Sequence, residues 1–225
     1  MTDNQRKVLY WLLDVGVNVV IIVSLVFVIQ KWIVAPFDVS GSSMCDTLNF
    51  IDGECQNGKG ERIIINEAGY VFGEPQRGDI VVFKAPKEEG EEERYFIKRI
   101  IGIPGDKVEL IGGRVHLTTP GSDQSTQLKE EYLNSENQGN TDSILPNFSV
   151  FEVPENKYFL LGDNRRASTD SRLCFSRRPS TECKNNPERA FIHIDDIRGK
   201  AWLSWWPLSS IRIINHEYSE SLAEK

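Results

Sequence analysis

A run of small residues with three serines, Ser40-Gly41-Ser42-Ser43-Met44, is the first segment whose residue types could do chemistry. Small residues around a hydroxyl allow backbone N–H groups to face a substrate carbonyl, which an oxyanion site requires. The same composition is also typical of a linker. The run alone does not decide between a linker and a catalytic serine.

The second segment, Tyr95 to Ile101, places a lysine among apolar residues. Alternate residues of a strand share a face, so Lys98 lies between Phe96 and Ile100. In one interpretation the segment is an edge strand and the Lys98 amine extends to water. In the other, burial disfavours the ammonium and lowers the pKa of the amine, so a neutral Lys98 acts as a base. Arg99 is excluded from this role because a guanidinium stays charged.

The third segment, Gly162 to Arg172, is a dense polar loop that follows a predicted strand, Tyr158 to Leu161. Taken alone, it is also typical of a hydrogen-bonded turn. The three histidines, His116, His193 and His216, have no evident serine or acid partner, which disfavours a histidine triad. No His-x-x-x-His, Cys-x-x-Cys or glycine-rich phosphate motif occurs, which argues against zinc hydrolysis and nucleotide chemistry.

Among the 225 residues, 26 are Lys or Arg and 33 are Asp or Glu, so the net charge is −7. A nucleic-acid binder needs a basic surface to neutralise phosphates, and this balance excludes that class.

A membrane-spanning helix is predicted before these segments. Val8 to Ile29 holds one charge, Asp14, and as a helix would be roughly 33 Å long, which matches a bilayer core of ~30 Å. A buried core helix is the first alternative, but no later segment is apolar enough to surround it. A cleavable signal peptide is the second, but its one plausible cleavage site, Ile33-Val34-Ala35, is followed by Pro36. An uncleaved single-span anchor is favoured.

The charges that flank this helix predict its orientation. Arg6 and Lys7 precede it, and Lys31 is the nearest cation after it, which favours a cytoplasmic amino terminus. We therefore divide the chain into a cytoplasmic amino terminus (1–7), a transmembrane helix (8–30) and an extracytoplasmic domain (31–225).

The rest of the chain predicts an all-β domain, because short β-branched runs alternate with turn signals and no long amphipathic helix occurs. Residues 118–147 are rich in Ser, Asn, Gln and Gly and are predicted to be an insertion. The predicted strands are Arg62 to Asn66, Asp79 to Lys84, Tyr95 to Ile101, Lys107 to Leu110, Arg114 to Leu117, Tyr158 to Leu161, Ile197 to Trp202 and Ile211 to Ile214.

The three polar segments, in this order after one amino-terminal span, resemble type I signal peptidase over nearly the whole chain. Any one match is weak, but the matches in order are highly specific. The matching segments are Pro36 to Met44, Arg77 to Phe83, Tyr95 to Asp106, Gly162 to Arg172, and Gly199 to Ala201 with Trp206-Pro207.

This resemblance implies an antiparallel β catalytic domain of the signal peptidase/LexA-like fold. It also implies a membrane-bound serine endopeptidase that cleaves signal peptides from exported preproteins with a Ser–Lys dyad. Ser43 would be the nucleophile and Lys98 the general base, and later the acid for the leaving amine. Ser168 would orient the Lys98 amine, and Asp170 and Arg172 would form a supporting ion pair.

The resemblance also implies a substrate site with small pockets, which by sterics prefer an Ala-x-Ala sequence before the cut. Gly41 and Ser42 are assigned to the oxyanion loop, in which the Ser43 N–H is one donor and the second donor is left open. The implied setting is a bacterial-type cell membrane, where the enzyme meets preproteins and the secretion translocon as a monomer without metal or cofactor. The residues assigned to the pockets are Phe37, Val39, Met44, Leu48, Phe96 and Ile97.

Two positions depart from the family pattern: Asp46 stands where proline is usual, and Arg166 stands where aspartate is common. Two alternatives to a signal peptidase stay open. A LexA-type self-cleaving regulator would need a DNA-binding head and an Ala-Gly cleavage site before Ser43, and both are missing here. A membrane-anchored binding module that has lost activity would not need to retain Ser43, Lys98 and Ser168 together.

The four cysteines form two local pairs, and four cysteines allow three pairings. Their spacing disfavours zinc, and outside the membrane disulfides are the natural state. A bridge near the third box occurs in some family members, so a Cys174–Cys183 disulfide is expected. A Cys45–Cys55 disulfide would clamp the loop after the nucleophile.

Overall fold

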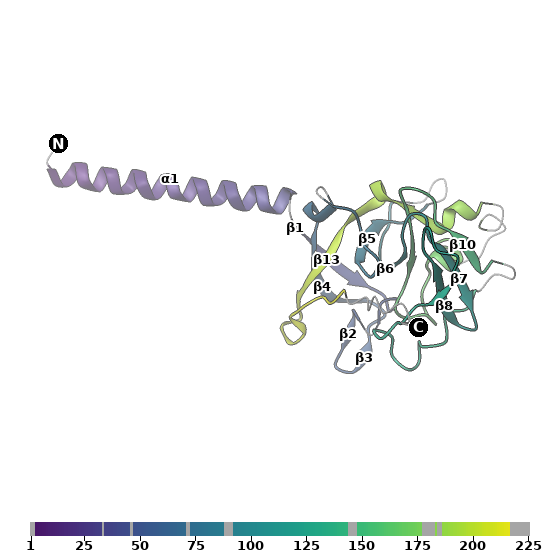
Figure 1. The fold of residues 1–225 in the computed structure, drawn as a ribbon. Helices are drawn as coiled ribbons and strands as arrows, with labels where there is room; N and C mark the ends of the chain where they lie inside the picture. The colour runs from purple at the N-terminus through teal and green to yellow at the C-terminus, as the bar shows by residue number, and fades with distance from the viewer. Residues whose placement is uncertain are drawn as a thin grey trace.

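The amino-terminal helix projects from the rest of the molecule as a single rod (Figure 1). The structure is a computed structural model that describes residues 3–32, 34–45, 47–70, 73–87, 92–143, 148–176, 183 and 186–216. The helix, α1 (Asp3–Trp32), is longer than predicted at both ends and is apolar enough to cross a membrane. None of its most apolar window is buried against the domain, so the structure excludes the core-helix alternative.

The main sheet contains eight strands whose pairings are all antiparallel, as the resemblance to the family implied. Its order is β1-β4-β13-β5-β6-β11-β12, with β14 paired to β13. The strands are β1 (Val34–Ser40), β4 (Lys59–Asn66), β5 (Ile80–Lys84), β6 (Tyr95–Gly102), β11 (Lys157–Leu161), β12 (Phe191–His193), β13 (Ile197–Trp206) and β14 (Arg212–Ile213).

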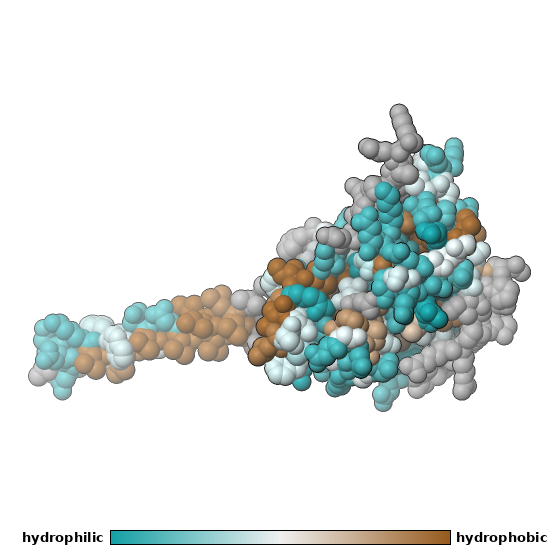
Figure 2. Space-filling model, turned by 90° about the horizontal axis from the view of Figure 1, so that it is seen from below, coloured by the Kyte–Doolittle hydropathy of each residue, from teal (hydrophilic) through white to brown (hydrophobic). Residues whose placement is uncertain are grey.

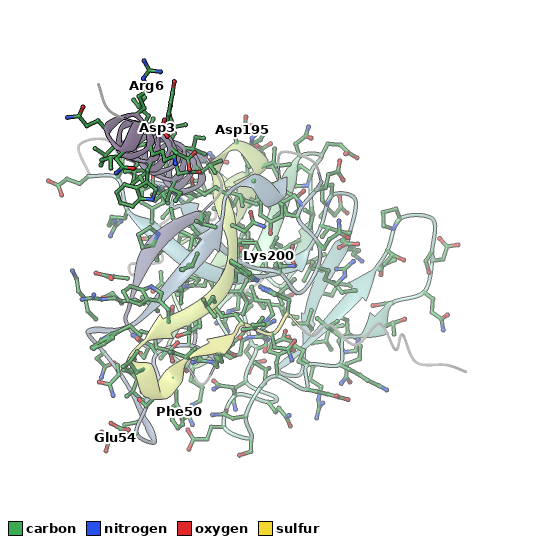
Figure 3. All side chains as sticks on the ribbon, turned by 90° about the vertical axis from the view of Figure 1, so that its left-hand side faces the viewer. Asp3, Arg6, Phe50, Glu54, Asp195 and Lys200 are labelled. Carbon is green, nitrogen blue, oxygen red and sulfur yellow. A yellow bond between two sulfur atoms is a disulfide. The ribbon has the colours of Figure 1, made fainter. Side chains whose placement is uncertain are left out.

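A second, four-stranded sheet has the order β10-β7-β8-β9, and a separate hairpin joins β2 to β3. Figure 3 shows Phe50 and Glu54 on this hairpin, away from Asp3 and Arg6 of α1. The strands are β7 (Lys107–Ile111), β8 (Arg114–Thr118), β9 (Thr126–Gln127), β10 (Val150–Glu152), β2 (Phe50–Ile51) and β3 (Glu54–Cys55). The short 3-10 helices are η1 (Ala68–Tyr70), η2 (Ser171–Leu173), η3 (Pro187–Ala190), η4 (Ile194–Asp196) and η5 (Leu208–Ser210).

The middle of the main sheet is buried on both faces. Ile80 and Val82 of β5 pack in one hydrophobic cluster, whereas Val81 and Phe83 pack in another. Strand β6 lies between β5 and β11, so it is an interior strand. The interpretation in which the Lys98 amine extends to water is wrong, because Lys98 is 3 % exposed, although β11 pairs only with the part of β6 that follows it.

Strand β1 connects α1 to the serine-rich segment and forms one edge of the main sheet (Figure 1). It was not predicted as a strand, because Pro36 weakens the strand pattern. Proline lacks a backbone donor and is tolerated in edge strands. Beyond Asp38 a register shift against β4 interrupts the pairing, and the chain then turns into the loop that carries Ser43.

Candidate active site

The Lys98 amine and the Ser43 hydroxyl meet at the surface of the main sheet. Lys98 comes from the interior strand β6, and Ser43 comes from the loop that follows β1. The Lys98 Nζ lies 2.7 Å from the Ser43 Oγ and 2.9 Å from the carbonyl oxygen of Ile97. This is the contact between a nucleophile and a base that hydroxyl activation requires.

Burial makes Lys98 a weaker acceptor of protons than a surface lysine. The residue is 3 % exposed, and its Nζ lies 5.4 Å from the centre of the Phe96 ring. Desolvation lowers the pKa of Lys98 to about 8, although the charges of Asp170 and Asp163 act in the opposite direction. The neutral amine, the form that a general base needs, is therefore far more abundant at neutral pH than it is in a surface lysine.

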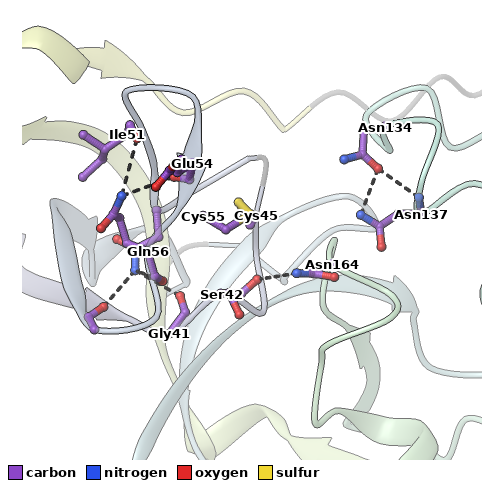
Figure 4. The surroundings of a disulfide bond; sticks show 12 residues. Gly41, Ser42, Cys45, Ile51, Glu54, Cys55, Gln56, Asn134, Asn137 and Asn164 are labelled. Atoms are coloured by element: carbon purple, nitrogen blue, oxygen red, sulfur yellow. Dashed lines mark hydrogen bonds between the residues drawn. A yellow bond between two sulfur atoms is a disulfide. The ribbon is translucent and has the colours of Figure 1, made fainter.

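The buried side chain of Asn49 holds the loop that carries Ser43. The disulfide between Cys45 and Cys55 closes the chain next to this loop (Figure 4). The Asn49 amide donates to the carbonyl oxygens of Gly41 at 3.0 Å and Gly58 at 3.2 Å, and its Oδ1 accepts from the Glu61 N–H. Gly41 has a φ of +85°, which favours glycine, and its N–H donates to the Gly58 carbonyl. Asn49 was not predicted as a site residue, because no local pattern marks a residue that bonds to backbone elsewhere in the chain.

The third polar segment contacts the nucleophile loop from the other side. The Asn164 N–H donates to the Ser43 carbonyl oxygen at 3.1 Å, and the Asn164 side chain donates to the Ser42 carbonyl oxygen at 3.0 Å (Figure 4). Among the described residues, the Ser43 N–H has no acceptor, so it is free to face a substrate carbonyl. The close approach of the third polar segment to the Ser43 loop also requires a glycine at position 162, since a Cβ added there would lie 2.4 Å from the Ser43 carbonyl oxygen.

The expected ion pair of Asp170 and Arg172 is present and buried. Arg172 Nη2 lies 2.8 Å from Asp170 Oδ2, and the same carboxylate accepts from the Gly162 N–H. Although burial raises it, the pKa of Asp170 is lowered overall by Arg172 and by its hydrogen-bond donors. The pair therefore fixes the strand-to-loop junction at Gly162, next to Asn164.

The expected hydrogen bond between Ser168 and Lys98 is not formed. The buried Ser168 Oγ has no partner within the described part of the chain. It lies against the Gly162 backbone instead, where an added Cβ would come within 2.2 Å of it. The Lys98 amine is held by Ser43 and Ile97 in this arrangement.

A second buried ion pair, between Arg99 and Asp163, was not predicted. Arg99 donates to both carboxylate oxygens of Asp163, at 2.9 and 2.7 Å, and to the Gly78 carbonyl oxygen. Thr47, just beyond the nucleophile, donates to Asp163 at 2.6 Å. The pair links β6 to the third segment on the face of β6 opposite Lys98, where strand alternation places Arg99.

A cavity of about 810 Å³ opens beside Ser43 and Lys98. Phe37, Phe96 and Ile97, which were assigned to substrate pockets, lie on its wall. Val39, Met44 and Leu48, which were assigned to the pockets as well, do not line this cavity and are buried in a hydrophobic cluster that also contains Ile97. Strand alternation predicts the face on which these side chains lie, but it does not predict which of them reach the surface.

The cysteine sulfurs of both expected pairs lie at disulfide distance. Their Cα atoms are 5.9 Å apart for Cys45 and Cys55, and 5.7 Å apart for Cys174 and Cys183. Of the two departures from the family pattern, Asp46 falls outside the described residues, and Arg166 is exposed with its N–H bonded to Asn137. No group of three potential metal ligands occurs among the residues the structure describes.

Comparison with known proteins gives a consistent description. Residues 12–206 match the family described as signal peptidase, peptidase S26. Signal peptidase IB of Staphylococcus aureus (strain COL) is 31 % identical over 221 residues, which cover 92 % of this chain and 94 % of that protein. Signal peptidase I S of Bacillus subtilis (strain 168) is 34 % identical over 174 residues, 76 % of this chain and 81 % of that protein. A signal peptidase I structure from Enterococcus faecalis V583 is 27 % identical, with a TM-score of 0.38 over 57 % of this chain and 97 % of that one.

Proposed function

The chain belongs to the signal peptidase family, peptidase S26, whose members cleave signal peptides from preproteins, and we propose that it does so with Ser43 and Lys98 as a catalytic dyad. The observation that carries this assignment is the 2.7 Å contact between Lys98 Nζ and Ser43 Oγ. The family is one of serine peptidases, so neither a self-cleaving regulator nor an inactive binding module is needed to account for the chain.

In the proposed reaction, neutral Lys98 takes the proton of the Ser43 hydroxyl while Oγ attacks the carbonyl carbon of the scissile peptide bond. The resulting oxyanion accepts a hydrogen bond from the Ser43 N–H, within the loop that Gly41 and Ser42 shape. Lys98 then gives its proton to the leaving amine as the C–N bond breaks, which leaves an ester on Ser43. Lys98 next deprotonates a water molecule that hydrolyses this ester and restores the serine.

Asp170 and Arg172 are proposed as supporting residues that act through Gly162. The Asp170 carboxylate accepts from the Gly162 N–H, and Asn164, two residues later, donates to the Ser42 and Ser43 carbonyls. Charge-assisted hydrogen bonds of this kind are shorter and stronger than neutral ones. They would hold the nucleophile loop at a constant distance from Lys98.

We assign an Ala-x-Ala-like cleavage site on steric grounds. The aromatic rings of Phe37 and Phe96, together with Ile97, occupy the wall of the cavity next to Ser43. Large substrate side chains would clash with these rings, whereas alanine would not.

We further propose that α1 anchors the enzyme in a bacterial-type cell membrane. In this assignment residues 1–7 are cytoplasmic, 8–30 span the bilayer, and 31–225 form the catalytic domain outside, with 118–147 as an insertion. The segment from β13 to β14 exposes several large apolar side chains, and Figure 2 shows brown surface both on α1 and on the end of the domain from which it projects. The exposed side chains of this segment are Trp202, Trp206, Leu208, Ile211 and Ile213. The enzyme would act as a monomer, meet substrates near the translocon, and retain both disulfides in that oxidising compartment.

Cleavage of a preprotein with one Ala-x-Ala site tests the proposal. The full-length protein in detergent is compared with Ser43→Ala, Lys98→Ala and, as a matched control, Ser209→Ala, which alters an exposed serine of η5. A cut directly after the second alanine, lost in the first two variants and retained in the control, is expected. Cleavage that survives Ser43→Ala would mean that another residue is the nucleophile.

A further inference from the structure

We propose that Glu130, in the insertion between β9 and β10, is a positioning residue for the Ser43–Lys98 site and acts through Arg165 and Asn164. The inference deepens the proposed function and rests on it. Residues 128–141 form turns without helix or strand, and no chemistry was assigned to them. Their buried polar side chains nevertheless converge on the loop that contacts Ser43.

The first step is a buried ion pair between Glu130 and Arg165. The Arg165 side chain is 0 % exposed and the Glu130 side chain is 9 % exposed. Arg165 Nη2 lies 2.5 Å from Glu130 Oε1, and Nη1 lies 3.2 Å from Oε2, so the pair is bidentate. Thr141, at the other end of the same turns, accepts from Arg165 Nη1 at 2.6 Å.

The second step leads from Arg165 to the nucleophile. Arg165 Nε donates to the Gly162 carbonyl oxygen at 3.0 Å, so the guanidinium bridges the insertion and the loop. Between these two residues, Asn164 donates to the carbonyl oxygens of both Ser42 and Ser43. Glu130 is thus connected to the nucleophile loop through two residues, without touching substrate or reacting atoms.

A second contact from the insertion supports the same route. The Tyr132 hydroxyl lies 2.8 Å from Glu130 Oε1 and 3.2 Å from Arg165 Nη2. The Arg99 guanidinium lies 4.0 Å from the centre of the Tyr132 ring, and Arg99 is paired with Asp163 of the same loop. Residues 162–165 are therefore held by the insertion at two neighbouring points.

Isosteric removal of the Glu130 charge tests this role. Glu130→Gln is compared with Glu131→Gln, which removes the same charge from an exposed neighbour that has no ion pair in the described structure. Glu130→Gln should lower kcat for preprotein cleavage by about 10- to 100-fold with little change in KM, because a small misplacement of reacting groups has effects of this size. Glu131→Gln should match the wild type.

A double-mutant cycle separates positioning from a general loss of stability. If Glu130 acts through Asn164, Glu130→Gln should lower kcat much less in an Asn164→Ala background than in the wild type. Tyr132→Phe keeps the ring against Arg99 and removes only the hydroxyl, so it serves as a milder variant if Glu130→Gln does not fold. Additive losses in kcat, or equal rates for Glu130→Gln and Glu131→Gln, would overturn the inference.

Amide hydrogen exchange gives a readout that does not depend on activity. Protection of the Asn164 N–H, which donates to the Ser43 carbonyl, should fall in Glu130→Gln and stay unchanged in Glu131→Gln. Unchanged protection in Glu130→Gln overturns the positioning role. Failure of the wild type to cleave the preprotein would instead overturn the proposed function, so the two failures are distinguishable.

Discussion

A change of pH tests the assignment of Lys98 as the general base most directly. With a pKa of about 8, about 9 % of the Lys98 amine is neutral at pH 7 and about 91 % at pH 9. If the free enzyme needs a neutral amine, kcat/KM should rise about 10-fold over this interval and then level off. A lysine with the ordinary value of 10.5 would be about 0.03 % neutral at pH 7 and about 3 % at pH 9, which predicts a rise of about 100-fold.

The assay uses initial rates on a quenched fluorescent peptide with an Ala-x-Ala site, in detergent, from pH 6 to pH 10. Substrate concentrations stay well below KM, so the profile reports the free enzyme. Lys129→Ala, an exposed lysine of the insertion, serves as the control and should leave the midpoint unchanged. A 100-fold rise that continues beyond pH 9, or a flat profile, would show that Lys98 is not a desolvated base.

Three further predictions concern stability and packing. Lys98→Met should raise the free energy of unfolding at pH 7 by at most about 3 kcal/mol, because the fold lowers the Lys98 pKa and disfavours the ammonium. This gain in stability should shrink as the pH rises from about 8 to 10.5, and denaturant titrations at several pH values would show it. Gly162→Ala should abolish cleavage and lower stability by about 1–3 kcal/mol, since its Cβ would lie 2.4 Å from the Ser43 carbonyl oxygen; wild-type rates would contradict this packing. Replacing both Cys45 and Cys55 by alanine should lower stability by about 3 kcal/mol, because their bridge closes a loop with a sequence separation of 10; a midpoint in urea equal to that of the oxidised wild type would contradict the disulfide.

Local patterns predicted α1 and eight of the strands, but they missed β1 and the short strands β2, β3, β9, β10 and β12, and they did not predict how deeply individual residues are buried. The alternation around Lys98 was visible in the sequence, yet only the packing around this residue, which leaves it 3 % exposed, decides between a solvated and a desolvated amine. Likewise, Val39 lies on the same face of β1 as Phe37, but the packing of the core leaves only Phe37 at the cavity.

Residues that join distant parts of the chain escaped prediction for a different reason. Asn49 bonds to backbone, and the pairs Arg99–Asp163 and Glu130–Arg165 connect segments many residues apart. Nothing in a single sequence records such pairings, because period and spacing describe only neighbours along one element. Asp170 and Arg172 could be paired in advance only because the resemblance to the signal peptidase family implied their ion pair.

The short connection between α1 and the nucleophile limits how far the enzyme can reach. The helix ends at Trp32, and β1 leads almost directly to Ser43, which lies eleven positions further along the chain. Even fully extended, this tether would span at most about 37 Å at ~3.4 Å per residue, and the pairing of β1 with β4 prevents it from lengthening. With α1 in a bilayer, scissile bonds farther out than this tether allows would not be cut. The distance of a peptide bond from the membrane surface would thus help to determine whether it is cut, independently of the side chains that the substrate pockets recognise.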